Sequence, residues 1–353
     1  MWAIFLFSLN SPSFHLLLLD VNCEFGHNPP TRGDFMPDAY WRFRMDGLST
    51  LAFPGSNELM WVRIGTLAVV ATWVCACEAR DIHVDNKIGD DRFDGSAAVI
   101  VGDETGPFRT LTRALNVARK GDRIILVNTG EPYRESVTLQ GGRHSGYPDA
   151  PFEVVGNGAV LEGVQPVPVD AWTSVEGNLF RFQPTKLSFN VLYLDGKPAA
   201  RREVKNVKDV ALLQPLEWCL FQQHVYFRVE PNRLPQSYDL SYSALPVGIT
   251  LYEVRYVLIR DLVVQGFQLD GINAHDGVRE TTLLTLNARG NGRSGISVGG
   301  ASRVRIESCL VGNNGAAQVR TEGASHTQLI GCDVLENPAP RLVRDGGEVE
   351  ESR

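Results

Sequence analysis

Lysine is absent from this sequence after Lys208, and the 34 Lys and Arg residues are outnumbered by 41 Asp and Glu. The 353 residues carry a formal net charge of −7, which argues against a nucleic-acid-binding protein, because such proteins neutralise phosphates with clustered Lys and Arg. Cysteine is also sparse. The cysteines beyond residue 79 are odd in number and predict no disulfide framework: Cys219, Cys309 and Cys332.

Long apolar runs are lacking as well. The run at 64–74 is about the length of a signal-peptide core and too short to span a bilayer as an anchor. Arg63 precedes it and small residues follow at Ala76 and Ala79, which is typical of a signal peptide over 60–79. We therefore expect a secreted, periplasmic or cell-surface protein with no membrane span in the mature chain.

Residues 1–59 show no clear strand or helix periodicity. We interpret them as a spurious or disordered extension ahead of Met60. The alternative is a genuine N-terminal export segment, since Trp2–Leu9 is also apolar. Both interpretations predict export.

Residues 80–163 contain the strongest helix signal of the chain, over 107–120, and then several short strand-like runs. Pro107 suits the first turn of this helix, and Gly121 follows its end. Its apolar residues fall on one face: Phe108, Leu111, Leu115 and Ala118. We expect a helical cap over the first coils of a stacked β structure.

Residues 164–247 are rich in proline and alternate polar with apolar residues over short runs. Turn signals such as Asp195-Gly196 separate these runs. The pattern predicts an inserted antiparallel β subdomain beside the main body. Trp172, Trp218 and Tyr226 are candidate sugar platforms, but aromatic residues in a small β subdomain usually belong to its core.

Residues 248–345 repeat with steps of 24, 23 and 23 residues. Four apolar columns and one polar column remain in phase. They are Ile259, Leu283, Ile306 and Leu329; Leu262, Leu286, Cys309 and Cys332; Val264, Ala288, Val311 and Val334; Ile272, Ile296, Val319 and Leu342; and Asn291, Asn314 and Asn337, with Phe267 in the first coil.

Such columns predict a parallel β-helix, in which each coil pairs with the next at about 4.8 Å and buries the apolar face that a single coil leaves exposed. Asn residues in one column can hydrogen-bond along the stack. A leucine-rich repeat is the rival, but its unit contains more leucine and a helical segment. Cys309 and Cys332 would lie within disulfide reach, although Leu in the same column favours buried, unpaired cysteines.

The chain resembles secreted right-handed parallel β-helix proteins of the pectate-lyase-like superfamily, over roughly 81–345. The resemblance rests on Val84-Asp-Asn86, Gly106–Leu115, Gly121-Asp122, Tyr133-Arg-Glu135 and the repeats after Val257. Val175–Arg181 and Leu192–Gly196 resemble the side domain of some carbohydrate-active members. The implied fold is an all-β, right-handed parallel β-helix with an N-terminal capping helix and an inserted antiparallel β subdomain. The implied partner is a polysaccharide in a lateral groove.

Two reactions are open. A lyase removes a proton beside a uronate carboxylate with a basic residue, often with calcium; the coils lack lysine, so arginine would have to serve. A glycoside hydrolase needs two carboxylates, for which the coils offer candidates but no clear pair. The missing lysines slightly favour hydrolysis. The densest polar cluster supplies Asp270 and Asp276 as catalytic acid or base and His275 and Asn273 as substrate contacts. Arg289 and Arg293, near a bend, complete the predicted substrate site.

The remaining alternatives concern binding and metal. A non-catalytic glycan-binding or surface protein is the second hypothesis, because the same polar residues suit a solvated bend. No cofactor is implied. Calcium remains possible at the acidic loop that contains Asp90, Asp91 and Asp94, although its spacing matches no defined calcium loop. We expect a monomer. The acidic tail, 346–353, either caps the last coil or marks a truncated solenoid.

Overall fold

The computed structural model describes residues 2–5, 17–20, 79–185, 188–337 and 339–353. The chain divides into two compact units, Met1–Trp73 and Val74–Arg353. In the first, β1 (Trp2–Phe5) pairs antiparallel with β2 (Leu17–Asp20). The predicted signal peptide lies outside the described residues, apart from Ala79. Everything below concerns the second unit.

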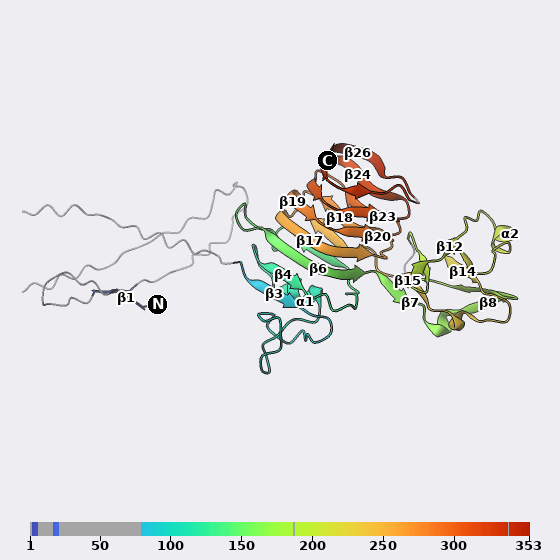
Figure 1. Ribbon diagram of the computed structural model, residues 1–353, viewed down its shortest axis with the longest axis horizontal. Coiled ribbons are helices and arrows are strands. Elements are labelled where there is room, and N and C mark those ends of the chain that lie inside the picture. Colours follow the sequence, from blue (N-terminus) through green and yellow to red (C-terminus); the bar gives the residue numbers. More distant parts are fainter. Residues whose placement is uncertain (1, 6–16, 21–78, 186–187, 338) are drawn as a thin grey trace, which may run out of the picture. The chain divides into compact units, whose positions relative to one another are not determined.

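A 15-stranded parallel sheet winds through the second unit as successive coils. Because long strands bend at the corners, we describe it as three faces, A, B and C. In Figure 1 the strands are stacked as rungs that end at β26, beside the C-terminus. The predicted parallel β-helix is thereby confirmed.

Face A carries eight strand segments. They are β3 (Asp81–Val84), β4 (Arg123–Leu126), the first part of β6 (Phe152–Glu162), the first part of β17 (Arg255–Gln265), β19 (Arg279–Leu284), β22 (Arg303–Glu307), the second part of β24 (Ala317–Ile330) and the second part of β26 (Leu342–Ser352).

Faces B and C complete each coil. Face B consists of the second parts of β6 and β17, then β20 (Asn287–Arg289), β23 (Leu310–Gly312) and β25 (Asp333–Val334). Face C consists of β5 (Val137–Gln140), β16 (Ile249–Tyr252), β18 (Asp270–Asp276), β21 (Ser294–Val298) and the first parts of β24 and β26.

The predicted apolar columns fill the interior. Ile259 pairs with Leu283, which pairs with Ile306 and then with Leu329. The Ile272 and Val264 columns pair in the same way. Nearly all of these side chains are buried in one continuous core. Stacking like on like therefore provides the apolar burial that no single coil can achieve.

In the four coils from β17 to β25, the corner between faces A and B is a single left-handed residue. Asp261, Thr285 and Ser308 have φ of 55°, 53° and 52°, and Gly331 has φ of 56°. This conformation is rare for a β-branched residue such as Thr285. It persists because the paired strands on both sides fix the corner, which keeps this turn short in these four coils.

The corner between faces B and C carries the polar ladder. Asn291 and Asn314 are buried, and Asn314 Oδ1 accepts from Asn291 Nδ2 at 3.0 Å and from Asn291 N at 3.0 Å. Asn337 also bonds to the neighbouring coil, since its Oδ1 accepts from Asn313 N at 3.2 Å, but its side chain is exposed. Gln318 takes the next inner position and accepts from Asn314 Nδ2 at 2.9 Å.

The predicted capping helix is present but shorter than expected. Helix α1 spans Leu111–Val117 with Thr110 as its N-cap, and Ala118 is already extended. The Glu135 carboxylate accepts from the Leu111 and Thr112 backbone N–H groups, at 2.8 Å each. A carboxylate at a helix N-terminus stabilises the unpaired N–H groups there. Leu111, Ala114 and Leu115 pack on the core.

Two small sheets form the inserted subdomain. One consists of β7 (Val164–Pro166), β10 (Leu192–Leu194), β11 (Lys197–Pro198) and β15 (Leu240–Ser243); the other of β8 (Thr173–Glu176), β9 (Leu179–Phe182), β12 (Ala200–Arg201), β13 (Glu217–Phe221) and β14 (His224–Arg228). Their pairing is antiparallel, except between β12 and β13. Three short helical turns complete it, η1 (Val169–Ala171), α2 (Val207–Val210) and η2 (Pro235–Ser237).

The aromatic residues of the subdomain belong to its own core. Trp218 is 1% exposed, and its Nε1 donates to Ala199 O at 3.1 Å. Trp172 packs edge-on against Phe182 with ring centroids 4.8 Å apart. Neither tryptophan is therefore presented to a sugar. The Tyr193 hydroxyl donates to Gly290 O at 2.6 Å, which attaches the subdomain at the corner between faces B and C.

Candidate functional site

The outer side of face C carries a row of small polar residues. Because side chains alternate along a strand, the inward Ile272 and Ile296 leave Asn273 and Ser297 pointing outward, and these two are register partners. The same column includes Thr138 and Thr250 before them and Arg320 after them. Ser297 is 1% exposed, but the hydroxyl and amide groups of Thr138, Thr250 and Asn273 are accessible and suit the hydrogen-bonding pattern of sugar hydroxyls.

Asp270 lies at the edge of this face, but its carboxylate is enclosed. Its side chain is 0% exposed and forms a bidentate pair with Arg293, with Nε to Oδ1 at 3.0 Å. Ser294 Oγ also donates to Oδ1, at 2.5 Å. Hydrogen bonding to Asp270 raises the pKa of Arg293 above its usual value. In this arrangement Asp270 cannot contact a substrate directly and instead orients Arg293.

A line of alternating charges continues from Arg293 across face C. Arg293 Nη1 lies 3.8 Å from Glu322 Oε1. Arg320 Nε contacts the same oxygen at 2.5 Å and also pairs with Asp345. The Glu322 side chain is 37% exposed, so it remains open to solvent within this network.

Asp276 stands at the other end of β18, after a register shift opposite Leu251 and Tyr252. It is exposed, and its Oδ1 accepts from Gly277 N at 2.8 Å and from Ala301 N at 3.0 Å. The hydrogen bond from Ala301, then that from Gly277, holds the pKa of Asp276 below its usual value. The carboxylate is therefore ionised at neutral pH, and the same hydrogen bonds make it a weaker base than an ordinary aspartate.

His275, next to it, is exposed and lies 6.1 Å from the ring of Tyr252, centroid to centroid. The two rings are tilted by 31°. They provide an aromatic margin beside Asp276. His275 and Asn273 thus lie with Asp276 on one surface, as the predicted substrate contacts require.

Two glycines form a bare floor between Asp276 and Glu322. A Cβ at Gly300, where φ is 59°, would lie 2.2 Å from Asp276 Oδ1. A Cβ at Gly299 would lie 3.8 Å from Glu322 Oε2. Asp276 therefore lies beside Gly300 and Glu322 beside Gly299. The two carboxylates come from the coils on either side of the one that carries the glycines. Any side chain at Gly300 would displace the Asp276 carboxylate, so this position requires glycine.

Arg289 does not join the cluster. It lies on face B, exposed, and its Nε donates to Gln265 Oε1 at 3.0 Å. Arg293, only four residues later, lies on face C because the corner at 290–292 separates them. Of the six predicted site residues, the structure brings four to the outer surface of face C, encloses Asp270 at its edge and leaves Arg289 elsewhere.

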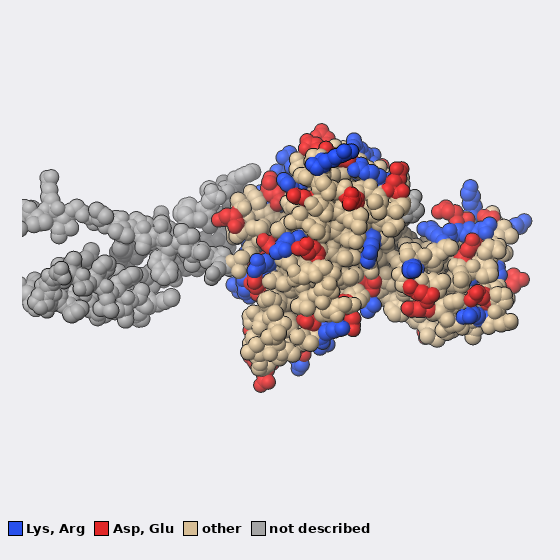
Figure 2. Space-filling view, viewed as in Figure 1, with Lys and Arg blue, Asp and Glu red and all other residues tan. Residues whose placement is uncertain are grey.

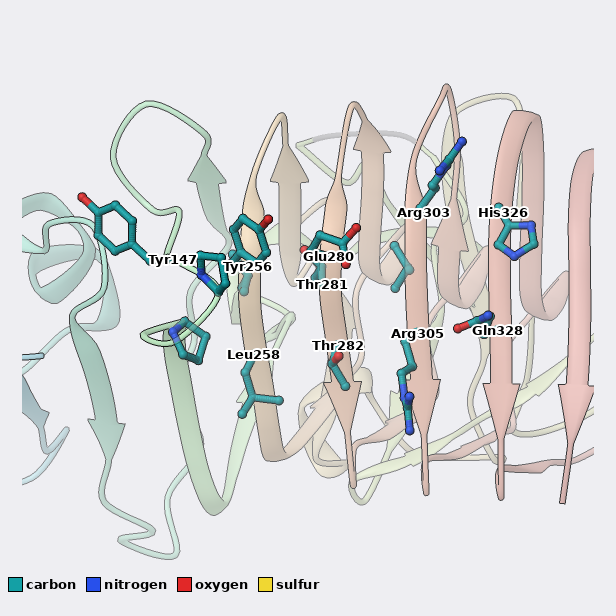
Figure 3. Close-up of a pocket in the computed structure, with 14 residues that line it drawn as sticks. Tyr147, Tyr256, Leu258, Glu280, Thr281, Thr282, Arg303, Arg305, His326 and Gln328 are labelled. Carbon is teal, nitrogen blue, oxygen red and sulfur yellow. The ribbon is translucent and has the colours of Figure 1, made fainter. Parts of the chain in front are cut away.

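A second candidate surface is a groove of about 710 Å³ on the outer side of face A. Figure 3 shows its lining in two rows, Tyr256, Glu280, Arg303 and His326 above Leu258, Thr282, Arg305 and Gln328. Tyr147, Pro148 and Pro151 close one end. Sequence reasoning missed this surface, although Arg255, Arg279, Arg303 and His326 recur at steps of 24, 24 and 23 residues.

The acidic loop near the N-terminus uses its carboxylates internally. Asp90 pairs with Arg92, Asp91 accepts from the Arg109 and Thr110 backbone, and Asp94 accepts from Ser96. Across the described ranges, no group of three or more His, Cys, Asp or Glu residues converges on a possible metal position. These residues therefore give no support to the calcium hypothesis.

Charge over the described part of the chain is mixed. Figure 2 shows acidic and basic side chains interspersed over the visible face of the second unit. None of the described helices is both long and apolar enough to cross a bilayer.

Comparisons with known proteins relate this chain to others through its fold. No protein-family model matches the sequence, and no curated protein matches it. A solved "Glycoside hydrolase" structure is similar, with a TM-score of 0.52, 12% identity and coverage of 72% of this chain and 73% of that chain.

Weaker likenesses include "The complex structure of XylC with xylose", at a TM-score of 0.47 and 15% identity over 71% of this chain. The chain spans 59% of the length of that protein. Pectate lyase Pel9A has a TM-score of 0.35 and 10% identity, over 77% of this chain and 62% of that one. The strand register and the likeness to the glycoside hydrolase together show that this chain is a right-handed parallel β-helix protein with an inserted antiparallel β subdomain.

Proposed function

We propose that this protein is an exported carbohydrate-active enzyme that binds a polysaccharide along the outer side of face C and hydrolyses it. The observation that carries the proposal is the pair of accessible carboxylates, Asp276 and Glu322, on either side of the bare Gly299–Gly300 step. Hydrolysis of a glycosidic bond requires two such groups. Asn273 and Thr250, on the same surface, would hydrogen-bond sugar hydroxyls.

Asp276 is assigned the role of base. Its carboxylate is exposed and ionised at neutral pH, so it can take a proton from a water molecule beside it. The two carboxylates come from coils two strand spacings apart, roughly 10 Å at about 4.8 Å each. That is close to the upper end of the range for inversion, in which water attacks from the side opposite the leaving group.

Glu322 is assigned the role of acid, which donates a proton to the departing glycosidic oxygen. In the unliganded protein Arg320 contacts this carboxylate at 2.5 Å. Arg320 has a second acidic partner in Asp345, so it can leave Glu322 without losing all charge compensation. We infer that a bound sugar displaces Arg320 and so frees Glu322 to carry a proton.

Elimination is less well supported than hydrolysis. It would require a basic residue free to remove a proton beside a uronate carboxylate. Arg293 and Arg320, which flank Glu322 on face C, are engaged with acidic partners, and the sequence has no lysine beyond Lys208.

The test is a reducing-sugar and ultraviolet assay on pectin, alginate, xylan and chondroitin. Hydrolysis produces new reducing ends without ultraviolet-absorbing products. We expect Asp276→Asn and Glu322→Gln each to lower kcat by at least about 100-fold, the range of general acid–base catalysis. Asp333→Asn, an exposed carboxylate on face B, is the matched control and should leave kcat unchanged. Unsaturated products, or activity untouched by both variants, would contradict the proposal.

Binding without catalysis is the second candidate, and the enclosure of Asp270 favours it. This carboxylate is 0% exposed and paired with Arg293, so one of the two predicted catalytic groups is unable to reach a sugar. Retention of the same polysaccharides on the immobilised protein, with no products in either assay, would select this alternative.

A further inference from the structure

A column of basic residues runs along the margin of face A, at its corner with face C. Arg255 is the register partner of Arg279, and Arg303 is that of His326. The backbone joins the two pairs in the same pattern, since Arg279 N donates to Val254 O and Arg303 N to Val278 O. Three arginines and a histidine therefore stack on four successive coils, which we call the basic column.

The arginines of this column have no compensating partner. Among the described residues, no ion pair or side-chain hydrogen bond engages the guanidinium of Arg255, Arg279 or Arg303, and all three residues are exposed. Like charges directly opposite each other on neighbouring strands are destabilising. An anionic ligand that lies along the column would relieve this repulsion. A purely structural role does not explain why three unpaired arginines lie side by side.

The column ends at a defined point. His326 lies between two carboxylates of the last coil, with Nδ1 3.5 Å from Glu348 and Nε2 3.6 Å from Glu350. These acids would repel a polyanion beyond the fourth coil. The binding surface thus covers three strand spacings, roughly 14 Å at about 4.8 Å each.

The groove on face A lies beside this column and shares Arg303 and His326 with it (Figure 3). Glu280 is the one carboxylate among the residues that line the groove. Tyr147, which is 46% exposed, and Tyr256 provide aromatic surfaces at the opposite end. Aromatic faces pack on the apolar faces of sugar rings, and arginine pairs bidentately with carboxylate or sulfate groups.

We propose that the groove on face A and the basic column form a second, non-catalytic site for an extended anionic glycan. The negative groups of the glycan would pair with Arg255, Arg279 and Arg303, and its sugar rings would lie against Tyr147 and Tyr256. Carboxylate and sulfate esters offer the same chemistry here. The proposal does not depend on the reaction proposed at face C, so binding measurements alone test it.

Binding is measured by isothermal titration of the full chain with oligomers of polygalacturonate, chondroitin sulfate and neutral xylan, at low and high salt. We expect the anionic oligomers to bind and xylan to bind at least about 10-fold more weakly, with affinity falling as salt screens the arginines. The two anionic oligomers distinguish uronate from sulfate as the recognised group. Duplex DNA of the same charge serves as a non-sugar polyanion.

The decisive variant is Arg255→Gln/Arg279→Gln/Arg303→Gln. Exposed ion pairs are individually weak, so we expect each substitution to weaken binding about 2- to 5-fold and the triple variant at least about 10-fold. The Arg→Lys triple variant, which keeps the charge, should recover part of the affinity. Arg119→Gln, an exposed arginine near α1, is the matched control and should not change it.

Two further readouts separate this site from folding and from face C. Removing stacked like charges should leave the thermal midpoint unchanged or raise it, so weaker binding with a lowered midpoint would overturn the proposal. Asp276→Asn/Glu322→Gln should bind the anionic oligomers normally. No binding by the wild-type protein, equal binding of DNA, or full affinity in the triple glutamine variant would also overturn it.

Discussion

Replacing Asn314 with alanine removes the central amide of the ladder at the corner between faces B and C. In the native protein Asn314 Oδ1 accepts from both the backbone N and the side-chain Nδ2 of Asn291, at 3.0 Å each. Its own Nδ2 donates to Ala288 O and Gly312 O at 3.1 Å and to Gln318 Oε1 at 2.9 Å. The side chain is 0% exposed, so no bulk water replaces these partners.

The magnitude follows from the groups left unpaired. The Asn291 N–H loses its acceptor in a buried position, which costs about 1–3 kcal/mol. Asn291 Nδ2 keeps a bond to Val264 O at 3.3 Å, and Gln318 Oε1 keeps the Asn314 backbone N–H at 3.1 Å. With a smaller contribution from the space left by the amide, we expect unfolding to become easier by about 2–4 kcal/mol.

The assay is guanidinium denaturation followed by far-ultraviolet circular dichroism. Tryptophan fluorescence is unsuitable, because Trp172 and Trp218 lie in the inserted subdomain and not in the coils. The matched control is Asn313→Gly at the neighbouring residue, which is exposed with φ of 58° and tolerates glycine. It should change the free energy of unfolding by less than about 0.5 kcal/mol. Equal effects of the two substitutions would refute the ladder as a stabilising element.

Three further predictions concern charge and thiol chemistry. Arg293→Gln leaves the enclosed Asp270 carboxylate unpaired and should lower the free energy of unfolding by about 3 kcal/mol in chemical denaturation; Asp270→Asn added to it should restore most of the loss, and no restoration would contradict the pairing. The lowered pKa of Asp276 means that its carboxylate stays ionised as pH falls. Any hydrolysis should therefore retain its base down to about pH 4, the ordinary aspartate value. A loss of kcat that is centred above pH 6 and is unchanged in Asp276→Asn would assign the base to another residue. The hydrogen bond with Cys332 and burial raise the pKa of Cys309, whereas Cys332 is half-buried and its pKa is lowered by the same hydrogen bond; iodoacetamide at pH 7 should therefore label Cys332 first, as read by peptide mass spectrometry, and preferential labelling of Cys309 would contradict this order.

The repeat could be predicted from the sequence because each apolar column consists of residues that recur at a nearly fixed step along the chain. Ile259, Leu283 and Ile306 occupy equivalent places in successive coils, and each must be apolar for the next to be buried. The same reasoning located the polar residues of β18. It did not foresee that Gln318, and not Asn337, occupies the buried position next to Asn314.

The candidate site was only partly predictable for a related reason. Asp270 and Asp276 look equivalent in sequence, yet one carboxylate is enclosed by Arg293 of the next coil and the other faces solvent. Glu322 follows Asp276 by 46 residues and reaches the glycine step only because two coils bring it there. The environment of each carboxylate is thus set by residues of neighbouring coils.

The sequence by itself determined the periodic columns, and with them the solenoid, since hydrophobic burial between coils depends only on which residues recur. Tertiary structure alone decided which polar groups are open to a ligand. It enclosed Asp270, separated Arg289 from Arg293 across a corner, and aligned Arg255, Arg279 and Arg303 along one margin. The physical reason is that solvent exposure and ion pairing depend on neighbours from other coils, and their positions follow from the folded register.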